Sequence, residues 1–131
     1  MKTIIAGSRS IKDYKIVEEA VKELEIEITE IVSGGATGVD SLAEAYAIYN
    51  DIEFTLFKAE WNKIDKNSVV KKGKYGSYNV SAGTERNKKM GDYADALIAI
   101  WDGKSTGTKH MIEYMHKLGK EVFVFKYIKE K

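Results

Sequence analysis

An unbroken apolar run from Ala96 to Trp101 restricts the fold of this 131-residue chain more than any other feature. A strand that is apolar at every position is buried on both faces, which is typical of a parallel sheet covered by helices. Further apolar runs alternate with segments of helical periodicity; they lie at residues 3–6, 31–33, 53–57 and 121–125. This alternation predicts an α/β fold with a five-stranded parallel sheet in the order 3-2-1-4-5, which makes the first and fourth strands neighbours.

Between the strands, apolar residues recur at helical spacing. Helices are predicted from Asp13, which can cap the first one, over residues 39–50, around residues 86–90, and over residues 108–118. Residues 58–82 are predicted to form a long connection in which lysines alternate with Trp61, Tyr75 and Tyr78. The chain has no proline and no repeat, so we expect residues 1–131 to form a single domain.

Composition narrows the functional classes. The formal net charge is only +1, whereas proteins whose main partner is nucleic acid usually carry a strong basic excess, so a nucleic-acid partner is not expected. The absence of cysteine excludes thiolate metal sites and cysteine nucleophiles. No apolar run is long enough to span a bilayer and no signal-peptide pattern is present, which favours a cytoplasmic protein without a membrane partner.

Three turns that follow predicted strands are rich in glycine and hydroxyl residues: residues 7–10, 33–40 and 102–108. The carboxyl ends of parallel strands share one edge of a sheet, so these turns are expected to converge where such folds bind ligands. Helix amino-terminal amides at that edge favour anions. The only two arginines, Arg9 and Arg86, lie beside predicted helix starts, where a guanidinium can grip a phosphate with two hydrogen bonds.

The turns do not match the dinucleotide-binding fingerprint or a P-loop. Together with the segment after the long connection, they resemble the SLOG superfamily, and in particular its YspA and cpYpsA-related branch; the segments that carry the resemblance are residues 7–9, 33–40, 82–90 and 101–108. The resemblance implies a Rossmann-like three-layer sandwich that binds a nucleotide or a nucleotide derivative related to NAD or ADP-ribose.

That resemblance leads to one main interpretation of function and two alternatives. The main one is a protein that senses or sequesters a small nucleotide signal and requires no cofactor. The first alternative is an N-glycosidase related to the phosphoribohydrolases of the superfamily, and the second is single-stranded DNA binding of the kind associated with DprA, a relative with a similar segment at residues 33–36.

The hydrolase alternative depends on an acidic residue. Phosphoribohydrolases of the superfamily carry a P-G-G-x-G-T-x-x-E motif, and the position of its glutamate is Met111 in this chain. Other carboxylates are therefore the catalytic candidates: Asp40, Glu85, Asp102 and Glu113. Without a positioned acid, binding without turnover is the expected behaviour.

Most of the predicted ligand contacts come from the three turns. The set is Gly7, Ser8, Arg9, Ser33, Gly34, Gly35, Asp40, Arg86, Asn87, Asp102, Gly103, Ser105, Thr106, Gly107 and Thr108. Arginines, amides and hydroxyls would hold phosphates, and aspartates would accept from ribose hydroxyls.

Several of these residues have a structural alternative: helix capping for Asp40, turn formation for Asp102 and tying down a turn for Asn87. Trp61 could stack on a base, although packing is the commoner role of such a side chain. His110 and His116 lack partners at metal-ligand spacing and are expected on a solvated helix face, so no metal site is predicted.

Large side chains on two predicted helices exceed what covering a sheet requires: Tyr46, Tyr49, Met111, Tyr114 and Met115. We therefore expect a homo-oligomer, in the simplest form a two-fold dimer.

Overall fold

A five-stranded parallel sheet forms the centre of the protein, seen here in a computed structural model that describes residues 1–59, 70–73, 76–79 and 82–127. Its strands are β1 (Lys2–Gly7), β2 (Glu30–Ser33), β3 (Glu53–Leu56), β6 (Ala96–Trp101) and β7 (Glu121–Lys126). They are arranged in the order β3-β2-β1-β6-β7, and every neighbouring pair is parallel. The predicted fold class and strand order are therefore confirmed.

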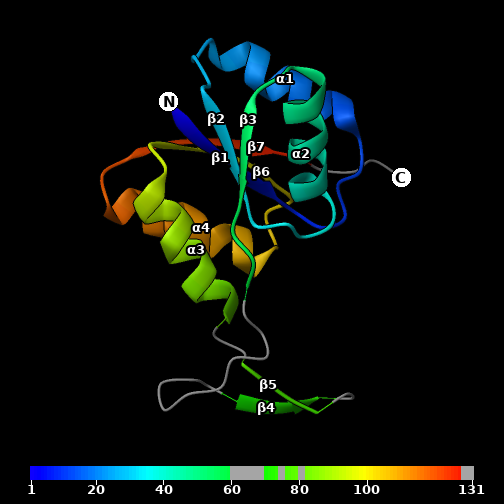
Figure 1. The fold of residues 1–131 in the computed structure, drawn as a ribbon, viewed down its shortest axis with the longest axis vertical. Helices are drawn as coiled ribbons and strands as arrows, with labels where there is room; N and C mark the ends of the chain where they lie inside the picture. Colours follow the sequence, from blue (N-terminus) through cyan, green and yellow to red (C-terminus); the bar gives the residue numbers. More distant parts are fainter. Residues whose placement is uncertain (60–69, 74–75, 80–81, 128–131) are drawn as a thin grey trace.

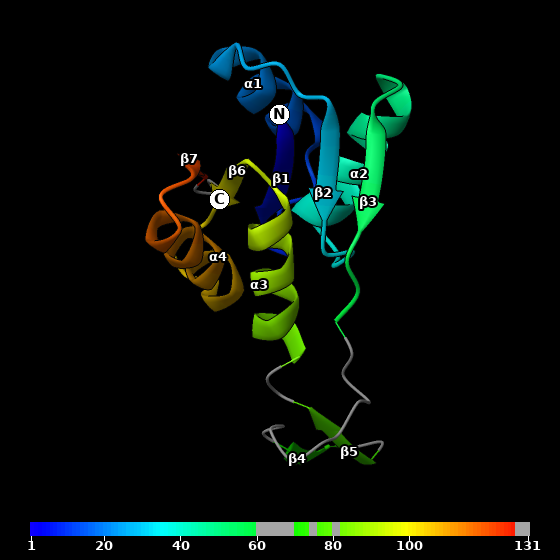
Figure 2. The same ribbon diagram turned by 60° about the vertical axis from the view of Figure 1, so that its left-hand side comes forward.

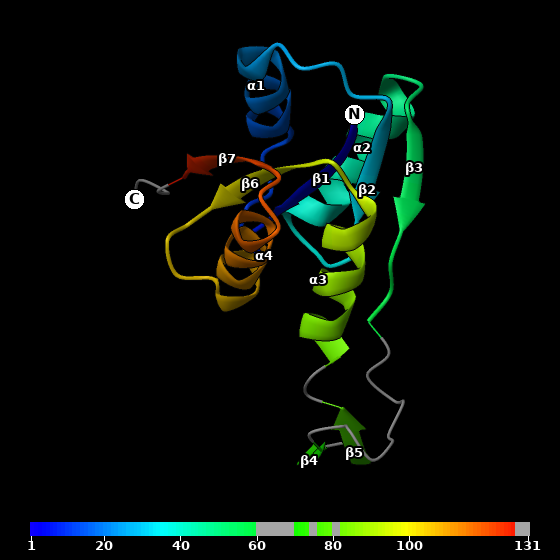
Figure 3. The ribbon, with the colours of Figure 1, turned by 90° about the vertical axis from the view of Figure 1, so that its left-hand side faces the viewer.

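Four helices cover the two faces of the sheet (Figures 1 and 3). They are α1 (Tyr14–Leu24), α2 (Val39–Tyr49), α3 (Ala82–Tyr93) and α4 (Thr106–Lys117). Neighbouring residues of β1 point to opposite faces: Ile5 packs in the core with α1 and α2, and Ile4 packs in the core with α3 and α4. The apolar run in β6 supplies both cores, which explains why every one of its first five residues is buried.

The long connection contains a second, smaller sheet. Strands β4 (Val70–Gly73) and β5 (Gly76–Asn79) form an antiparallel pair. Figure 2 shows this pair apart from the main sheet, beyond β3. It was not predicted, because short segments rich in lysine and glycine give a weak strand signal. The predicted base-stacking residue, Trp61, lies outside the described residues.

The side chains that suggested a dimer have other roles. Met111 and Met115 are buried in the core between α3, α4 and the sheet. Tyr46 packs against the core of α1 and α2, and the Tyr114 hydroxyl donates to Asp92 at 2.6 Å. Of the five, only Tyr49 is strongly exposed, at 78%. Four of the five side chains therefore do not form the exposed surface from which the dimer was predicted, and the dimer itself stays a prediction.

Helix length is modest throughout the described part of the chain. In those ranges, no helix is both long and apolar enough to cross a membrane.

Candidate functional site

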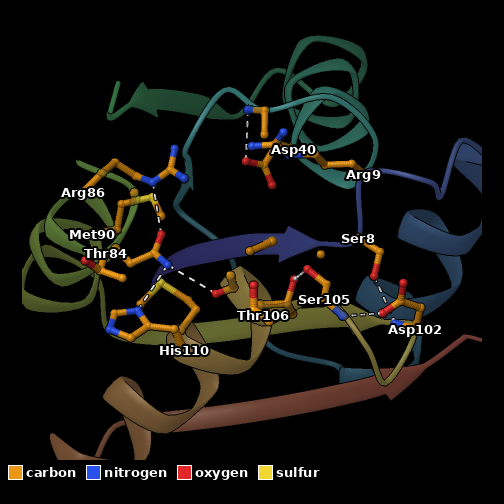
Figure 4. A pocket seen from close by; sticks show the side chains of 18 of the residues that line it. Ser8, Arg9, Asp40, Thr84, Arg86, Met90, Asp102, Ser105, Thr106 and His110 are labelled. Atoms are coloured by element: carbon orange, nitrogen blue, oxygen red, sulfur yellow. Dashed lines mark hydrogen bonds between the residues drawn. The ribbon is translucent and has the colours of Figure 1, made fainter. Parts of the chain in front are cut away.

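A pocket of about 580 Å³ opens at the carboxyl ends of β1 and β6, the neighbouring strands at which the strand order reverses (Figure 4). Its walls come from the turns after these strands, the start of α2, and facing sides of α3 and α4. Eleven of the predicted contacts line it: Gly7, Ser8, Arg9, Asp40, Arg86, Asn87, Asp102, Ser105, Thr106, Gly107 and Thr108.

Four predicted contacts do not line this pocket. Gly34 and Gly35 line a smaller neighbouring one, Ser33 is buried, and Gly103 is exposed in the turn after β6. The Ser33 hydroxyl donates to the backbone carbonyl of Asp40 and accepts from the backbone amide of Gly35, each at 3.3 Å. Ser33 therefore shapes the turn between β2 and α2, and direct ligand contact was the wrong expectation for it.

The turn after β1 is joined to the turn after β6. Ser8 is 1% exposed, and its hydroxyl oxygen accepts from the backbone amide of Asp102 at 3.0 Å. Gly7 has to be glycine because a Cβ there would lie 2.1 Å from the carbonyl oxygen of Ile100. These two residues hold the strand ends together, so their main contribution to the pocket is its shape.

The turn between β2 and α2 is held from inside by Asp40. This carboxylate is 7% exposed and accepts from the backbone amide of Ala36 at 3.1 Å. Burial raises the pKa of Asp40, while the nearby charges of Arg86 and Arg9 oppose that rise. The helix N-cap itself is Gly38, so Asp40 closes the turn from within the first helical turn rather than capping it.

Arg86 is fixed in position by two hydrogen bonds. Its Nη1 donates to the carbonyl oxygen of Gly34 at 2.6 Å, and its Nε donates to Asn87 Oδ1 at 3.0 Å. Burial lowers the pKa of Arg86, and repulsion from Arg9 acts in the same direction. Part of the Arg86 fork therefore already binds protein, and the two-handed phosphate clamp expected of Arg86 stays a prediction.

Arg9 differs from Arg86 in being exposed. Both arginines line the pocket, and in Figure 4 the carboxylate of Asp40 lies between them. When Asp40 is ionised, two positive charges share one negative charge, and the group carries a net charge of +1. This corner of the pocket therefore attracts anions.

The start of α4 forms the opposite wall. Asp102 Oδ1 accepts from the backbone amides of Lys104 and Ser105, both at 2.8 Å, and these bonds lower the pKa of Asp102. Turn formation is thus the role that its contacts support. Ser105 is the N-cap but makes no capping bond with its side chain, and a Cβ on Gly107 would meet nothing within 4 Å. The first-turn amides of α4 can therefore be approached closely from the pocket.

The expectation that His110 lies on a solvated helix face is wrong. It is half-buried and lines the pocket, and its Nδ1 lies 3.3 Å from the amide nitrogen of Asn87. Its ring stacks near Tyr114, with centroids 6.3 Å apart and an interplanar angle of 14°. Burial and then the charge of Lys88 lower its pKa. His116 is exposed, as expected.

A spacing signal for His110 was present in the sequence. It follows Gly107 by three residues and so lies on the same face of α4. Asn87 connects both to α3, since its Nδ2 also donates to the carbonyl oxygen of Gly107 at 3.2 Å. Because this amide nitrogen is a donor, the neutral His110 ring accepts at Nδ1 and carries its proton on Nε2.

The carboxylates of the pocket are poorly placed for hydrolysis. Of the four candidates, only Asp40 and Asp102 line the pocket, and both accept hydrogen bonds from backbone amides. Glu85 and Glu113 are exposed, and Glu113 lies 3.8 Å from Lys109. Met111 lies in the pocket wall at the position of the hydrolase glutamate. Within the described residues, no cluster of histidine, aspartate and glutamate could hold a metal ion.

Comparison with known proteins confirms the resemblance that the motifs predicted. Residues 1–64 match the model of the YspA, cpYpsA-related SLOG family. No curated protein matches the chain.

Solved structures with a similar fold include two of DNA processing protein A. The protein from Streptococcus pneumoniae has a TM-score of 0.68 and 22% identity, over 94% of this chain and 49% of that one. The protein from Helicobacter pylori, in a structure concerned with its single-stranded DNA binding mode, has a TM-score of 0.68 and 21% identity, over 95% of this chain and 64% of that one. The chain thus spans about half and about two thirds of these proteins.

These neighbours correct two expectations from the sequence. The main interpretation, a sensor of a small nucleotide signal, is not the one that they favour. The structure from H. pylori, which concerns single-stranded DNA binding, favours the second alternative and contradicts the expectation that a nucleic-acid partner is unlikely. Net charge is a weak basis for that expectation, because it is a sum over the whole chain, whereas binding depends on the charge at the site.

Proposed function

We propose that this protein binds single-stranded DNA at the carboxyl edge of its sheet. The observation that carries the proposal is the paired Arg9 and Arg86 around one buried carboxylate, beside the open first turn of α4. Its similarity in fold to the DNA-binding protein of H. pylori supports this choice among ligands that contain phosphate.

Electrostatics favour a phosphodiester at this position. The two guanidinium groups and the Asp40 carboxylate together carry +1, and a backbone phosphate carries −1. A helix amino terminus adds partial positive charge from the other wall. The arginine side of the pocket therefore favours a phosphate, although Asp102 adds a negative charge at the other wall and the protein as a whole is almost neutral.

The shape of the pocket favours an unpaired base. Its volume of about 580 Å³ is within the usual range for one ligand of nucleotide size. Met90, Met111 and the His110 ring supply apolar and aromatic wall. A base can reach such a wall only after it has left the stack and its partner strand, which single-stranded DNA allows without the energy of unpairing.

The test is fluorescence anisotropy with a labelled thymidine oligonucleotide of about 20 residues, a length that covers the usual single-strand site sizes. We expect binding that duplex DNA of the same length competes for poorly. Arg9→Gln should weaken it about tenfold, because a charge-assisted hydrogen bond contributes about 1.5–3 kcal/mol.

Lys22→Gln is the matched control, since Lys22 is an exposed cation in the last turn of α1, away from the pocket. Its affinity for the oligonucleotide should equal that of the wild type. The proposal fails if the wild type does not bind the oligonucleotide, or if both variants lose affinity equally.

A further inference from the structure

A second, smaller pocket of about 250 Å³ adjoins the first one. It lies between the turn after β2 and the residues that follow β3, and its own walls include Gly34, Gly35, Leu56 and Lys58. The two pockets share Arg9, Ala36 and Arg86. The two arginines therefore form a ridge between neighbouring hollows, not the end wall of a single site.

The ridge is rigid on the Arg86 side. The bonds to Gly34 and Asn87 hold its guanidinium in place. A Cβ on Gly34 would lie 2.3 Å from Arg86 Nη1, so the guanidinium can occupy this place only because residue 34 is glycine. A phosphate resting on the ridge would meet one fixed guanidinium, that of Arg86, and one exposed guanidinium, that of Arg9.

The second pocket is suited to part of a ligand. Its volume is below the range of about 300–1,000 Å³ that is usual for complete small-molecule sites. Leu56 is 43% exposed and covers Gly35, where a Cβ would lie 2.7 Å from Leu56 Cδ1. The pocket thus offers an apolar surface for one planar group, with the exposed Lys58 at its margin.

We propose that the smaller pocket is the second of two adjacent nucleotide subsites, with the phosphate that links the two nucleotides held on the Arg9–Arg86 ridge. One nucleoside occupies the larger pocket, and the base of its neighbour lies against Leu56. This inference rests on the proposed function and deepens it: the unit recognised is two linked nucleotides, so a mononucleotide makes only part of the contacts.

The test compares thymidine monophosphate with the dinucleotide d(TpT) by NMR titration of the labelled full chain. We expect the monophosphate to shift the amide signals of Gly107 and His110, and d(TpT) to shift these and also the signals of Gly35 and Leu56. We also expect d(TpT) to bind about fivefold more tightly, because each ligand carries one phosphate and d(TpT) adds only the contact of its second base with Leu56.

Leu56→Ser removes the apolar surface, and Val124→Ser is its matched control. Both residues lie on edge strands, and they are 43% and 44% exposed. Leu56→Ser should reduce the affinity for d(TpT) about fivefold, in line with the loss of one base contact, and leave the monophosphate unchanged. Val124→Ser should change neither affinity. Thermal unfolding of both variants checks that each is folded, and Lys58→Gln probes the same pocket independently.

The outcomes separate the two proposals. If the long oligonucleotide binds but d(TpT) binds no better than the monophosphate, or if Leu56→Ser affects both ligands alike, the second subsite is refuted and the proposed function stands. If the oligonucleotide and both short ligands all fail to bind, both proposals are refuted.

Discussion

Arg86 combines a structural and a binding role in one guanidinium group. Its bonds to Gly34 and Asn87 link α3 to the turn after β2, and its position beside Arg9 and Asp40 makes the pocket attractive to anions. Arg9 is exposed. It contributes charge to the pocket, and the turn after β1 does not depend on hydrogen bonds from its guanidinium. Replacing each arginine with lysine should therefore distinguish the structural role of Arg86 from the purely electrostatic role of Arg9.

Arg86→Lys should lower the free energy of unfolding by about 1–3 kcal/mol, because an ammonium cannot reproduce both bonds and leaves buried acceptors unpaired. Arg9→Lys should leave stability within about 0.5 kcal/mol of the wild type, as is usual for surface replacements. Urea unfolding of the three proteins measures both effects. Equal stability of wild type and Arg86→Lys would show that the guanidinium bonds do not support the fold.

Asp40→Asn should tighten binding of the thymidine oligonucleotide. The amide oxygen can still accept from the amide of Ala36, but the negative charge between the arginines is gone. Removing one negative charge next to the bound phosphate corresponds to roughly a three- to tenfold gain in affinity for the oligonucleotide. In the wild type, affinity should also rise as the pH falls through the raised pKa of Asp40, and the variant should lack that rise.

The pH dependence of stability, compared between the wild type and Asp40→Asn, gives a second test of the raised pKa of Asp40. Burial raises the pKa of Asp40, so the folded protein holds this proton more tightly than the unfolded chain does. The contribution of Asp40 to stability is therefore present at pH values below the ordinary pKa of aspartate and is lost as the pH rises through the raised value. That part of the pH dependence should vanish in Asp40→Asn; an unchanged profile would contradict the assignment.

At the scale of elements, the glycines of the three turns have different structural roles. Gly7 lets β1 approach β6, and Gly34 makes room for Arg86, so both serve packing inside the protein. Gly107 has open space where a side chain would be, in the first turn of α4. The pattern of glycines after strands was correctly associated with the ligand edge, but only one of these three glycines is open toward a ligand.

Gly107→Ala should therefore stabilise the protein while weakening DNA binding. Alanine is the better helix former by up to about 1 kcal/mol, and the new methyl group meets no protein atom. The same methyl group stands where a phosphate would approach the first-turn amides of α4. Thermal unfolding and anisotropy measure the two effects. A variant with unchanged affinity would remove the start of α4 from the binding surface.

Gly7→Ala should have the opposite effect on stability from Gly107→Ala. Its Cβ would lie 2.1 Å from the carbonyl oxygen of Ile100, so β1 and β6 would have to separate. The expected loss of stability is about 1–3 kcal/mol or more, as for other overpacked cores.

For the whole molecule, the net charge is +1, and the arginine side of the pocket at the carboxyl edge of the sheet is locally positive. Binding should depend on salt in proportion to the few phosphates that this edge can neutralise. With about two or three such contacts, the logarithm of the association constant should fall with the logarithm of salt concentration with a slope of about −1.4 to −2.1. Titrations at several salt concentrations measure it, and a slope much steeper than about −3 would mean that other lysines carry most of the binding.

The sequence by itself determined the class of fold, the order of the five strands and the edge at which the pocket opens. These follow from local signals: apolar runs such as Ala96–Trp101, helical spacing between them, and glycine-bearing turns after the strands. General rules of connection then leave few arrangements of the sheet. The hairpin of β4 and β5 was not predicted, because its short strands carry little such signal.

Only the tertiary structure decided which turn residues face the pocket and which bind another turn. The partner of Ser8 is 94 residues away in the chain and that of Arg86 is 52 residues away, and no local pattern specifies such pairs. The same reason accounts for His110, whose burial depends on Asn87 of another helix. A buried polar group must find a hydrogen-bond partner wherever the packed chain brings one, so the division between structural and binding residues arises only when the turns meet.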